Sequence, residues 1–260
     1  MSPVLLGAWE IRTAVGALAA LIGARQWTEN AAGGKIEAPD LRCNRKIPAA
    51  VAEPAQRAHV RIHPSIMLKS SRPATPIDFN APSEQVARRL IGAIFTVDGV
   101  GGRIVETEAY DRIDPASHTF SGPTPRNAVM FGPSAHVYVY RSYGIHWCLN
   151  FVCREEGHGA GVLIRAIEPL TGLDAMRQRR GLEPSRLLCS GPGRVAQALG
   201  ITHGNNGMSL FEAPFHIEAP EEKYPIATGP RIGITKAVDV PWRFGLAGSK
   251  FLSKPFPKEA

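Results

Sequence analysis

Cysteine is scarce in this sequence, and its spacing excludes two kinds of structural site. None of the four cysteines in the 260 residues belongs to a CxxC pair: Cys43, Cys148, Cys153 and Cys189. A zinc site or a disulfide framework needs paired cysteines at short, regular spacings. We therefore expect reduced thiols, no metal site and no disulfide bond.

Long hydrophobic runs are also missing. The apolar stretch from Thr13 to Ala24 is too short to span a bilayer. Glu10 precedes it and no small-residue cleavage site follows it, which argues against a secretory signal. The sequence therefore predicts no membrane association.

Acidic residues are fewer than basic ones, with 23 Asp and Glu against 30 Lys and Arg, a formal net charge of +7. This excess favours a polyanionic partner, although many basic proteins bind none. Hydrophobic residues make up 44% of the chain, which is normal for a globular protein. The chain is long enough for one large domain or two small ones.

Residues 1–72 differ from the remainder in being rich in alanine, proline and charge, with little periodicity. This composition predicts a poorly ordered extension. Residues 1–78 carry ten Lys and Arg against six Asp and Glu, so the extension would add non-specific affinity for a polyanion; a tail without function is the alternative. Translation starting at Met67 is a further hypothesis, which mass spectrometry would refute by detecting residues before Met67.

The side chains best suited to catalysis or binding lie between Glu106 and Asn150. Arg103 to Tyr110 alternates as a half-buried strand does, placing Ile104, Glu106, Glu108 and Tyr110 on one face. Carboxylates beside an aromatic ring, just before a turn-rich loop, suit a lined pocket. An exposed strand face with two solvated acids is the alternative.

Two further strands are predicted nearby. Val137 to Tyr143 puts Tyr138 and Tyr140 on one face, and the strand turns at Gly144. Tyrosines at this density suit either a pocket or an ordinary sheet face. In the next run, one face carries His146, Cys148 and Asn150, and the other, which we expect in the core, carries Ile145, Trp147, Leu149 and Phe151.

The predicted elements elsewhere are three helices and three strands. Apolar spacing and capping residues predict helices over Asn80–Phe95, from a Thr171 cap to Gly181, and from Ser190 to Gly200. Strands are predicted over Leu163–Pro169, Met208–Ile217 and Pro230–Ile234. Arg165 shares an apolar strand face with Leu163 and Ile167, and a buried guanidinium needs a partner, for which Glu108 is the candidate. Phe244 and Phe251 are expected in the core.

Taken together, these runs resemble the alkyladenine (3-methyladenine, or methylpurine) DNA glycosylase family. The similarity covers roughly Thr75 to Ser253. Ten blocks in family order carry it: ETEAY at 106–110, ASH at 116–118, RNxxMF at 126–131, YVYxxYG at 138–144, Asn150, LIRAIEP at 163–169, GLDAMRQRR at 172–180, CSGP at 189–192, PRIGI at 230–234 and PWRF at 241–244.

The resemblance implies roles for individual residues. Glu108 resembles the general base that activates a water, and Arg165 the residue that holds that carboxylate and water. Tyr110 and His118 would form one wall of a pocket for a flipped base, with Tyr140 as the other. Asn150 would exclude the 2-amino group of guanine, and Tyr143 would fill the gap in the duplex. The positions expected to contact the DNA backbone are Arg126, Arg194 and Arg231. A structural salt bridge is the alternative for Arg126, and core packing or surface charge is the alternative for Arg231.

The resemblance also implies an α+β fold, with a curved, mostly antiparallel sheet flanked by helices. The catalytic domain would span 75–253, after the extension (1–72) and before a C-terminal tail (254–260). Its activity would be monofunctional hydrolysis of alkylated or deaminated purines from duplex DNA, by a monomer without metal or organic cofactor. We expect it in the cytoplasm at the nucleoid, or in the nucleus of a eukaryote.

Two other functions remain open at this point. One is an inactive nucleic-acid-binding module of the same fold, against which the retained Glu108, Tyr110, His118 and Arg165 argue. The other is a hydrolase of free nucleosides, which would have no use for a wedge such as Tyr143.

The chain departs from the family in having Ser134-Ala135 where Pro-Gly is usual. Glycine is used where φ must be positive, so we expect alanine at this position to shift the loop before Tyr138.

Overall fold

An eight-stranded antiparallel sheet organises residues 76–257, which are the residues described by the structure, a computed structural model. The predicted extension 1–72 and the question of Met67 lie outside them. The strands are β1 (Ile94–Val97), β2 (Val100–Tyr110), β3 (Val137–Ser142), β4 (His146–Cys153), β5 (Ala160–Thr171), β6 (Phe215–Glu218), β7 (Ile226–Gly229) and β8 (Arg243–Leu246). The helices are α1 (Ser83–Leu90), α2 (Leu173–Arg180), α3 (Ser185–Leu188) and α4 (Pro192–Leu199), with 3₁₀ turns at Ala128–Phe131 and His203–Asn205.

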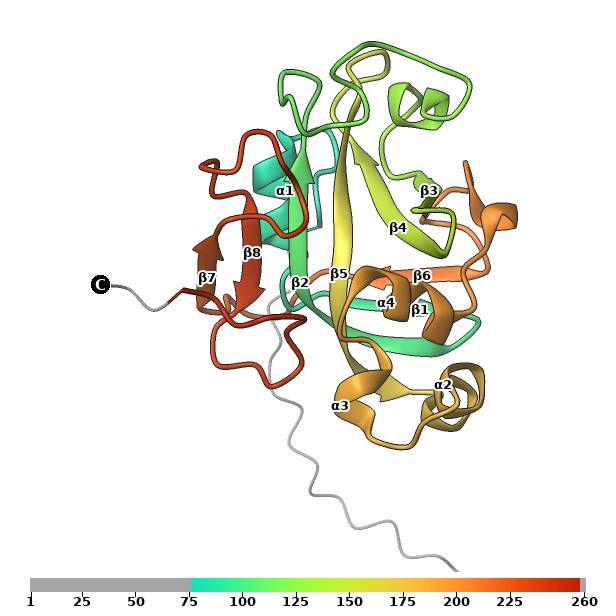
Figure 1. The fold of residues 1–260 in the computed structure, drawn as a ribbon. Helices are drawn as coiled ribbons and strands as arrows, with labels where there is room; N and C mark the ends of the chain where they lie inside the picture. The colour runs from blue at the N-terminus through green and yellow to red at the C-terminus, as the bar shows by residue number, and fades with distance from the viewer. Residues whose placement is uncertain (1–75, 258–260) are drawn as a thin grey trace, which may run out of the picture. The chain divides into compact units, whose positions relative to one another are not determined.

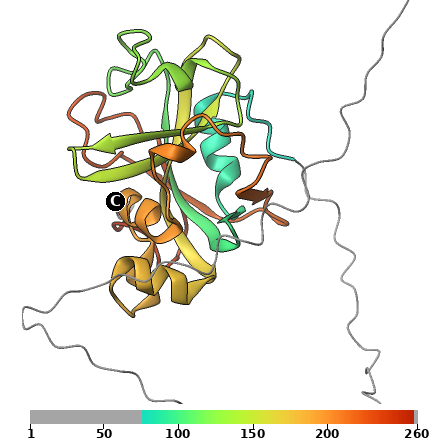
Figure 2. The same ribbon diagram turned by 90° about the vertical axis from the view of Figure 1, so that its right-hand side faces the viewer.

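The two long strands β2 and β5 form the centre of the sheet (Figure 1). β2 pairs with β5 along one edge; along its other edge it pairs first with β1 and then with β8. The β3–β4 hairpin continues the sheet beyond β5 and projects from one side of the molecule (Figure 2). The predicted α+β class and curved antiparallel sheet are confirmed.

Three register shifts interrupt the ladder between β2 and β5, and two of them lie beside the glutamates of β2. Ile104 pairs with Ile167, but Glu106 pairs with Ala166 and Thr107 with Ile164, so Val105 and Arg165 are the extra residues. A bulge shifts the alternation of side chains and re-aims a residue. Ile104 and Ile167 consequently join the main core, which corrects their predicted placement on the faces of Glu108 and Arg165.

The main core lies between the sheet and the helices that cover it. α1 packs against β2 and β5, and α4 packs against β4 and β5. The buried face of α1 carries Val86, Ala87 and Leu90, and the Thr107 hydroxyl donates to the Ala87 carbonyl at 2.9 Å. The helix predicted from Ser190 to Gly200 is present as α4, in which Val195, Ala198 and Leu199 are buried.

Several predicted boundaries were wrong because long-range pairing prevailed over local pattern. α1 ends at Leu90, since Gly92 has φ +91° and Ile94–Val97 pairs with β2. Thr171 ends β5, so the residue that caps α2 is Gly172.

The C-terminal half holds further corrections. Of the strand expected over Met208–Ile217, only the last residues are extended, as part of β6. Pro230–Ile234 forms no strand because the ladder of β7 with β8 stops at Gly229. Ile145 is 67% exposed instead of buried, whereas Phe244 is buried as expected; Phe251 is only partly buried.

Candidate active site

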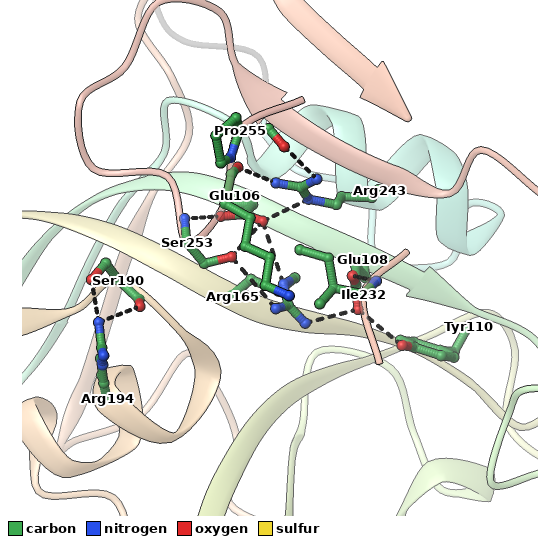
Figure 3. Close-up of polar contacts among 11 residues, drawn as sticks. Glu106, Glu108, Tyr110, Arg165, Ser190, Arg194, Ile232, Arg243, Ser253 and Pro255 are labelled. Carbon is green, nitrogen blue, oxygen red and sulfur yellow. Dashed lines mark hydrogen bonds and ion pairs between the residues drawn. The ribbon is translucent and has the colours of Figure 1, made fainter. Parts of the chain in front are cut away.

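Glu108 lies fully buried on β2, where three groups hold its carboxylate (Figure 3). The Tyr110 hydroxyl donates to Oε2 at 2.9 Å, and Arg165 Nη1 lies 3.3 Å from the same oxygen. The Ile232 backbone N–H donates to Oε1 at 2.8 Å. The alternative of two solvated acids is therefore wrong for this strand face.

The buried position changes the acidity of this carboxyl group. Burial raises the pKa of Glu108 above its ordinary value of 4.5, while Arg165 and the hydrogen bonds from Ile232 and Tyr110 act in the opposite direction. Glu106 adds a smaller upward contribution as a neighbouring like charge. A carboxylate with a raised pKa is a stronger base than an exposed one, which suits proton abstraction near neutral pH.

Arg165 pairs with both carboxylates of the strand. Its Nη1 contacts Glu108 at 3.3 Å and its Nε lies 3.4 Å from Glu106 Oε1. Its side chain is only 8% exposed. The predicted partnership with Glu108 is confirmed, and the bulge in β5 supplies its geometry.

A cavity of about 570 Å³ opens in front of this group, within the range of small-molecule sites. Tyr110, Tyr140, Asn150 and Arg165 line it, together with His118. The structure therefore brings the predicted base and pocket residues to one place from β2, β3, β4, β5 and the loop after β2. Glu108 itself has no exposed surface, and reaches the cavity through Tyr110, Arg165 and Ile232.

The aromatic residues divide differently from the expected arrangement. The His118 ring centroid is 4.5 Å from that of Tyr140, and Tyr138 stacks on Tyr140 at 5.6 Å. A flat base between two rings needs roughly 7 Å between them, twice the optimal contact distance. No base fits between His118 and Tyr140, so His118 belongs to the Tyr140 wall and not to that of Tyr110.

Burial also fixes the protonation of these rings. It lowers the pKa of His118, with Arg126 acting in the same direction, so the imidazole is neutral at neutral pH. Burial raises the pKa of Tyr138 to about 12 and raises those of Tyr110 and Tyr140 as well. The cavity is consequently lined by uncharged rings on both walls.

Arg231 has a structural position and does not reach the surface. Its side chain is fully buried, donates to Asp114 at 3.0 Å, and lies 4.8 Å from the centroid of the Tyr110 ring. A buried, ion-paired guanidinium cannot bind a phosphate, so the expected contact with the DNA backbone is wrong for this residue. Arg231 instead covers one face of Tyr110.

Asn150 and Tyr143 both line the cavity, but they differ in exposure. Asn150 is 5% exposed, and its Nδ2 donates to the Tyr138 carbonyl at 3.2 Å, which fixes the amide at the cavity wall. Tyr143 stands at the tip of the β3–β4 hairpin, 87% exposed and with φ +50°. A bulky residue rarely adopts this conformation, so the hairpin holds the ring outward at a local energetic cost.

Comparison with known proteins identifies the family of this chain. The model of the family described as methylpurine-DNA glycosylase matches residues 77–250. The chain belongs to this family.

Similar proteins come from several bacteria. Three relatives, each named "Putative 3-methyladenine DNA glycosylase", illustrate the match. The relative from Nitrosospira multiformis is 72% identical over 69% of this chain and 93% of its own length. The one from Rhizobium meliloti is 61% identical over 71% and 99%, and the one from Bradyrhizobium diazoefficiens is 59% identical over 69% and 90%. The resemblance noted in the sequence is confirmed.

The departure from the family at Ser134-Ala135 now has a structural explanation. Ala135 has φ +57°, in the left-handed region that glycine occupies at little cost. Its N–H donates to Val152 at 2.9 Å and its carbonyl accepts from Leu210 at 2.8 Å. In this methylpurine-DNA glycosylase, alanine keeps the same backbone conformation that a glycine would favour.

Two arginines remain exposed near the cavity. Arg126 lines its mouth and donates to the Arg141 carbonyl at 3.1 Å. Arg194, in the first turn of α4, is exposed and bonds to the Ser190 hydroxyl at 3.0 Å (Figure 3). Their contact with a phosphate stays a prediction.

Sequence reasoning missed the loop after β7. Ile232 donates to Glu108 across 124 residues of chain, and Lys236 lines the cavity. No local spacing could signal this, because the loop has no regular structure.

Within residues 76–257, no cluster of three His, Cys, Asp or Glu could hold a metal ion, and Cys148, Cys153 and Cys189 are free. None of the helices there has the length and apolar character needed to cross a membrane.

Proposed function

We propose that this methylpurine-DNA glycosylase flips damaged purines out of duplex DNA and hydrolyses their N-glycosidic bond, leaving an abasic site. The substrates are alkylated or deaminated purines, namely 3-methyladenine, 7-methylguanine, hypoxanthine and ethenoadenine. The observation that carries the proposal is a buried carboxylate, Glu108, paired with Arg165 behind a cavity with aromatic walls. An enzyme acting on a base must take it out of the stack.

In this mechanism Glu108 accepts a proton from water. The resulting hydroxide attacks C1′ of the deoxyribose, and the bond from C1′ to the purine nitrogen breaks. The leaving base takes the electron pair. A purine made cationic by N-alkylation departs as a neutral base, so one carboxylate suffices. Neutral hypoxanthine is a poorer leaving group, and we expect slower release. Small movements of the Tyr110 hydroxyl would admit the water beside Arg165.

The cavity would hold the base between Tyr110 on one side and Tyr140 with His118 on the other. Flat rings favour a purine by stacking, and electron-rich faces favour a cationic one. Asn150 would exclude the 2-amino group of guanine. Tyr143 would enter the gap in the duplex and offset part of the unstacking cost, while Arg126 and Arg194 would contact phosphates. The protein would act as a monomer.

Single-turnover base release tests the proposal. Two end-labelled duplexes, containing hypoxanthine or ethenoadenine, are treated with alkali after reaction, and methylated DNA is assayed for free 3-methyladenine. We expect release by wild type and by Glu222→Gln, an exposed control, and none by Glu108→Gln, which should still bind duplex. Near-normal turnover by Glu108→Gln would refute the role of Glu108.

Other outcomes separate the remaining functions. No release from any of the three substrates, with tight duplex binding, would indicate a binding module. Release that undamaged duplex cannot compete with would indicate a nucleoside hydrolase. Strand cleavage without alkali would indicate a lyase reaction, for which Lys236 is the lysine lining the cavity.

A further inference from the structure

The C-terminal segment beyond β8 reaches back to the buried pair of glutamates (Figure 3). We propose that Ser253–Phe256, here called the C-terminal clasp, positions Arg165 against Glu108 through Glu106. This inference rests on the proposed function of Glu108. It makes Glu106 and Ser253 positioning residues for base release, and it assigns a role to residues beyond the family match, which ends at 250.

Glu106 is the first link between the clasp and the catalytic carboxylate. It is fully buried, lies two residues before Glu108, and is on the same face of β2. Arg165 lies between the two glutamates, 3.4 Å from Glu106 and 3.3 Å from Glu108. Because one guanidinium is shared, any shift of Glu106 changes where Arg165 stands relative to Glu108.

Ser253 forms hydrogen bonds with both Glu106 and Arg165. Its hydroxyl lies 2.8 Å from Glu106 Oε1, to which it donates, and its backbone N–H donates to Oε2. Arg165 Nη2 donates to the same hydroxyl at 3.4 Å. The hydroxyl therefore accepts from the arginine and donates to the glutamate, which sets the distance between them.

Arg243 anchors the other side of Glu106. Its Nε donates to Glu106 Oε1 at 2.7 Å, and its Nη groups donate to the carbonyls of Lys254 and Pro255. The Phe256 ring lies 3.9 Å from the guanidinium carbon. Two guanidinium groups thus meet two carboxylates, so the buried cluster is electrically balanced. The clasp adds no charge to it, and instead supplies hydrogen bonds to Glu106 and Arg243.

Packing of Phe256 against the sheet fixes the position of the clasp. A Cβ on Gly245 would come within 2.4 Å of the Phe256 ring, so β8 must carry glycine where that ring lies. Phe256 also closes over Gly229 of the neighbouring strand β7. The clasp has no regular secondary structure, yet its residues are fixed by the sheet and the ion cluster. The predicted tail 254–260 therefore begins with residues that belong to the folded unit.

Ser253→Ala tests this proposal in the full-length chain. The variant loses the hydroxyl but keeps the backbone N–H bond to Glu106. We expect the single-turnover rate of hypoxanthine release to fall by roughly 10- to 100-fold, as for a misplacement near 1 Å. Duplex affinity and melting temperature should stay near those of wild type. Ser253→Thr keeps the hydroxyl and should recover most of the rate.

A matched control is Ser249→Ala, which removes a hydroxyl between β8 and the clasp that accepts from the Phe251 N–H; it should retain the wild-type rate. The pH profile gives an independent readout. The groups acting on Glu108 are Arg165, Tyr110 and Glu106, with Tyr140 and Cys148 also facing it. Since Arg165 lowers the pKa of Glu108, a loosened Arg165 should move the acid limb of the Ser253→Ala profile to higher pH.

The outcomes separate this inference from the proposed function. Loss of release in Glu108→Gln together with an unchanged rate and acid limb in Ser253→Ala would overturn the clasp alone. A fall in rate matched by equal loss in Ser253→Thr, with a lower melting temperature, would show a merely structural role and would also overturn it. Turnover in Glu108→Gln would overturn the underlying function.

Discussion

The Arg165 guanidinium lies 3.3 Å from the Glu108 carboxylate, although 57 residues separate them in the chain. Val105 and Arg165 are the extra residues of bulges in the adjacent strands β2 and β5. The two bulges offset each other, because Glu108 pairs with Leu163 in the same register in which Ile104 pairs with Ile167. They change the pairing only between Ile104 and Thr107, next to the glutamates that Arg165 contacts.

The rate of base release should have an acid limb above pH 4.5. Glu108 must be ionised to act as a base, and burial raises its pKa above 4.5, so the rate should fall as pH falls through that raised pKa. Single-turnover rates between about pH 4 and 9 on an ethenoadenine duplex measure this. Glu222→Gln should show the same limb. A rate that is flat down to pH 4.5 would contradict the prediction.

The raised pKa of Glu108 should also affect the stability of the fold. The folded state binds the Glu108 proton more tightly than the unfolded chain does, so ionisation costs stability as pH rises from about 4.5 through the raised pKa. Glu108→Gln removes this cost, and its free energy of unfolding at pH 7 should equal or exceed that of wild type. Urea unfolding at pH 5 and 7 would measure it. A clear loss at pH 7 would show that pairing with Arg165 outweighs burial.

Arg165→Lys should impair both activity and stability. A lysine is a point charge and cannot bridge Glu106 and Glu108 as the planar guanidinium does. We expect at least about a tenfold loss in single-turnover rate and a loss of roughly 2 kcal/mol in the free energy of unfolding, since a buried ion cluster is left poorly paired. Arg177→Lys, in a partly exposed pair with Asp174 and Glu183, should change neither by much. Wild-type behaviour of Arg165→Lys would refute the bridging role.

Tyr143→Gly should stabilise the hairpin while reducing activity. Glycine relieves the positive φ, and the ring is 87% exposed, so little packing is lost. We expect a gain of about 1 kcal/mol by urea unfolding and about a tenfold weaker single-turnover release. Tyr143→Phe keeps the ring and should retain activity without the gain. Full activity in the glycine variant would exclude a wedge.

Asn150→Ala should relax the exclusion of guanine. The amide is anchored by the Tyr138 carbonyl at the cavity wall, so its removal opens space where a 2-amino group would lie. Release of free guanine from undamaged duplex should become detectable above wild type on prolonged incubation. Ser142→Ala, which alters the same cavity, provides the control. Unchanged guanine release would count against this specificity role.

Ala135→Gly should be nearly neutral, whereas Ala135→Val should not. Relief of the left-handed conformation favours glycine by about 1–2 kcal/mol, but the loss of a buried methyl costs about 0.8 kcal/mol and backbone entropy roughly as much. Valine should lose more than about 2 kcal/mol, because a β-branched residue fits φ +57° poorly. Chemical denaturation of both variants tests this; a large loss in Ala135→Gly would contradict it.

The sequence by itself determined the local parts of this protein. Period-two alternation predicted β2, β3 and β4, since side chains on a strand alternate by simple geometry. An arginine on an apolar face needed a partner, which identified the pairing of Arg165 with Glu108. The family motifs gave the fold class, and the Tyr143-Gly144 turn was readable from the glycine.

Only the tertiary structure decided the contacts between distant segments. The bulges moved Ile104 and Ile167 into the core, and His118 joined Tyr140 instead of Tyr110. Arg231 became buried, and Ile232 and Ser253 reached the glutamates from irregular segments. Local sterics and hydrophobic period act over a few residues, whereas these positions follow from contacts between segments far apart in the chain, up to 147 residues for Ser253 and Glu106, which no spacing in the sequence encodes.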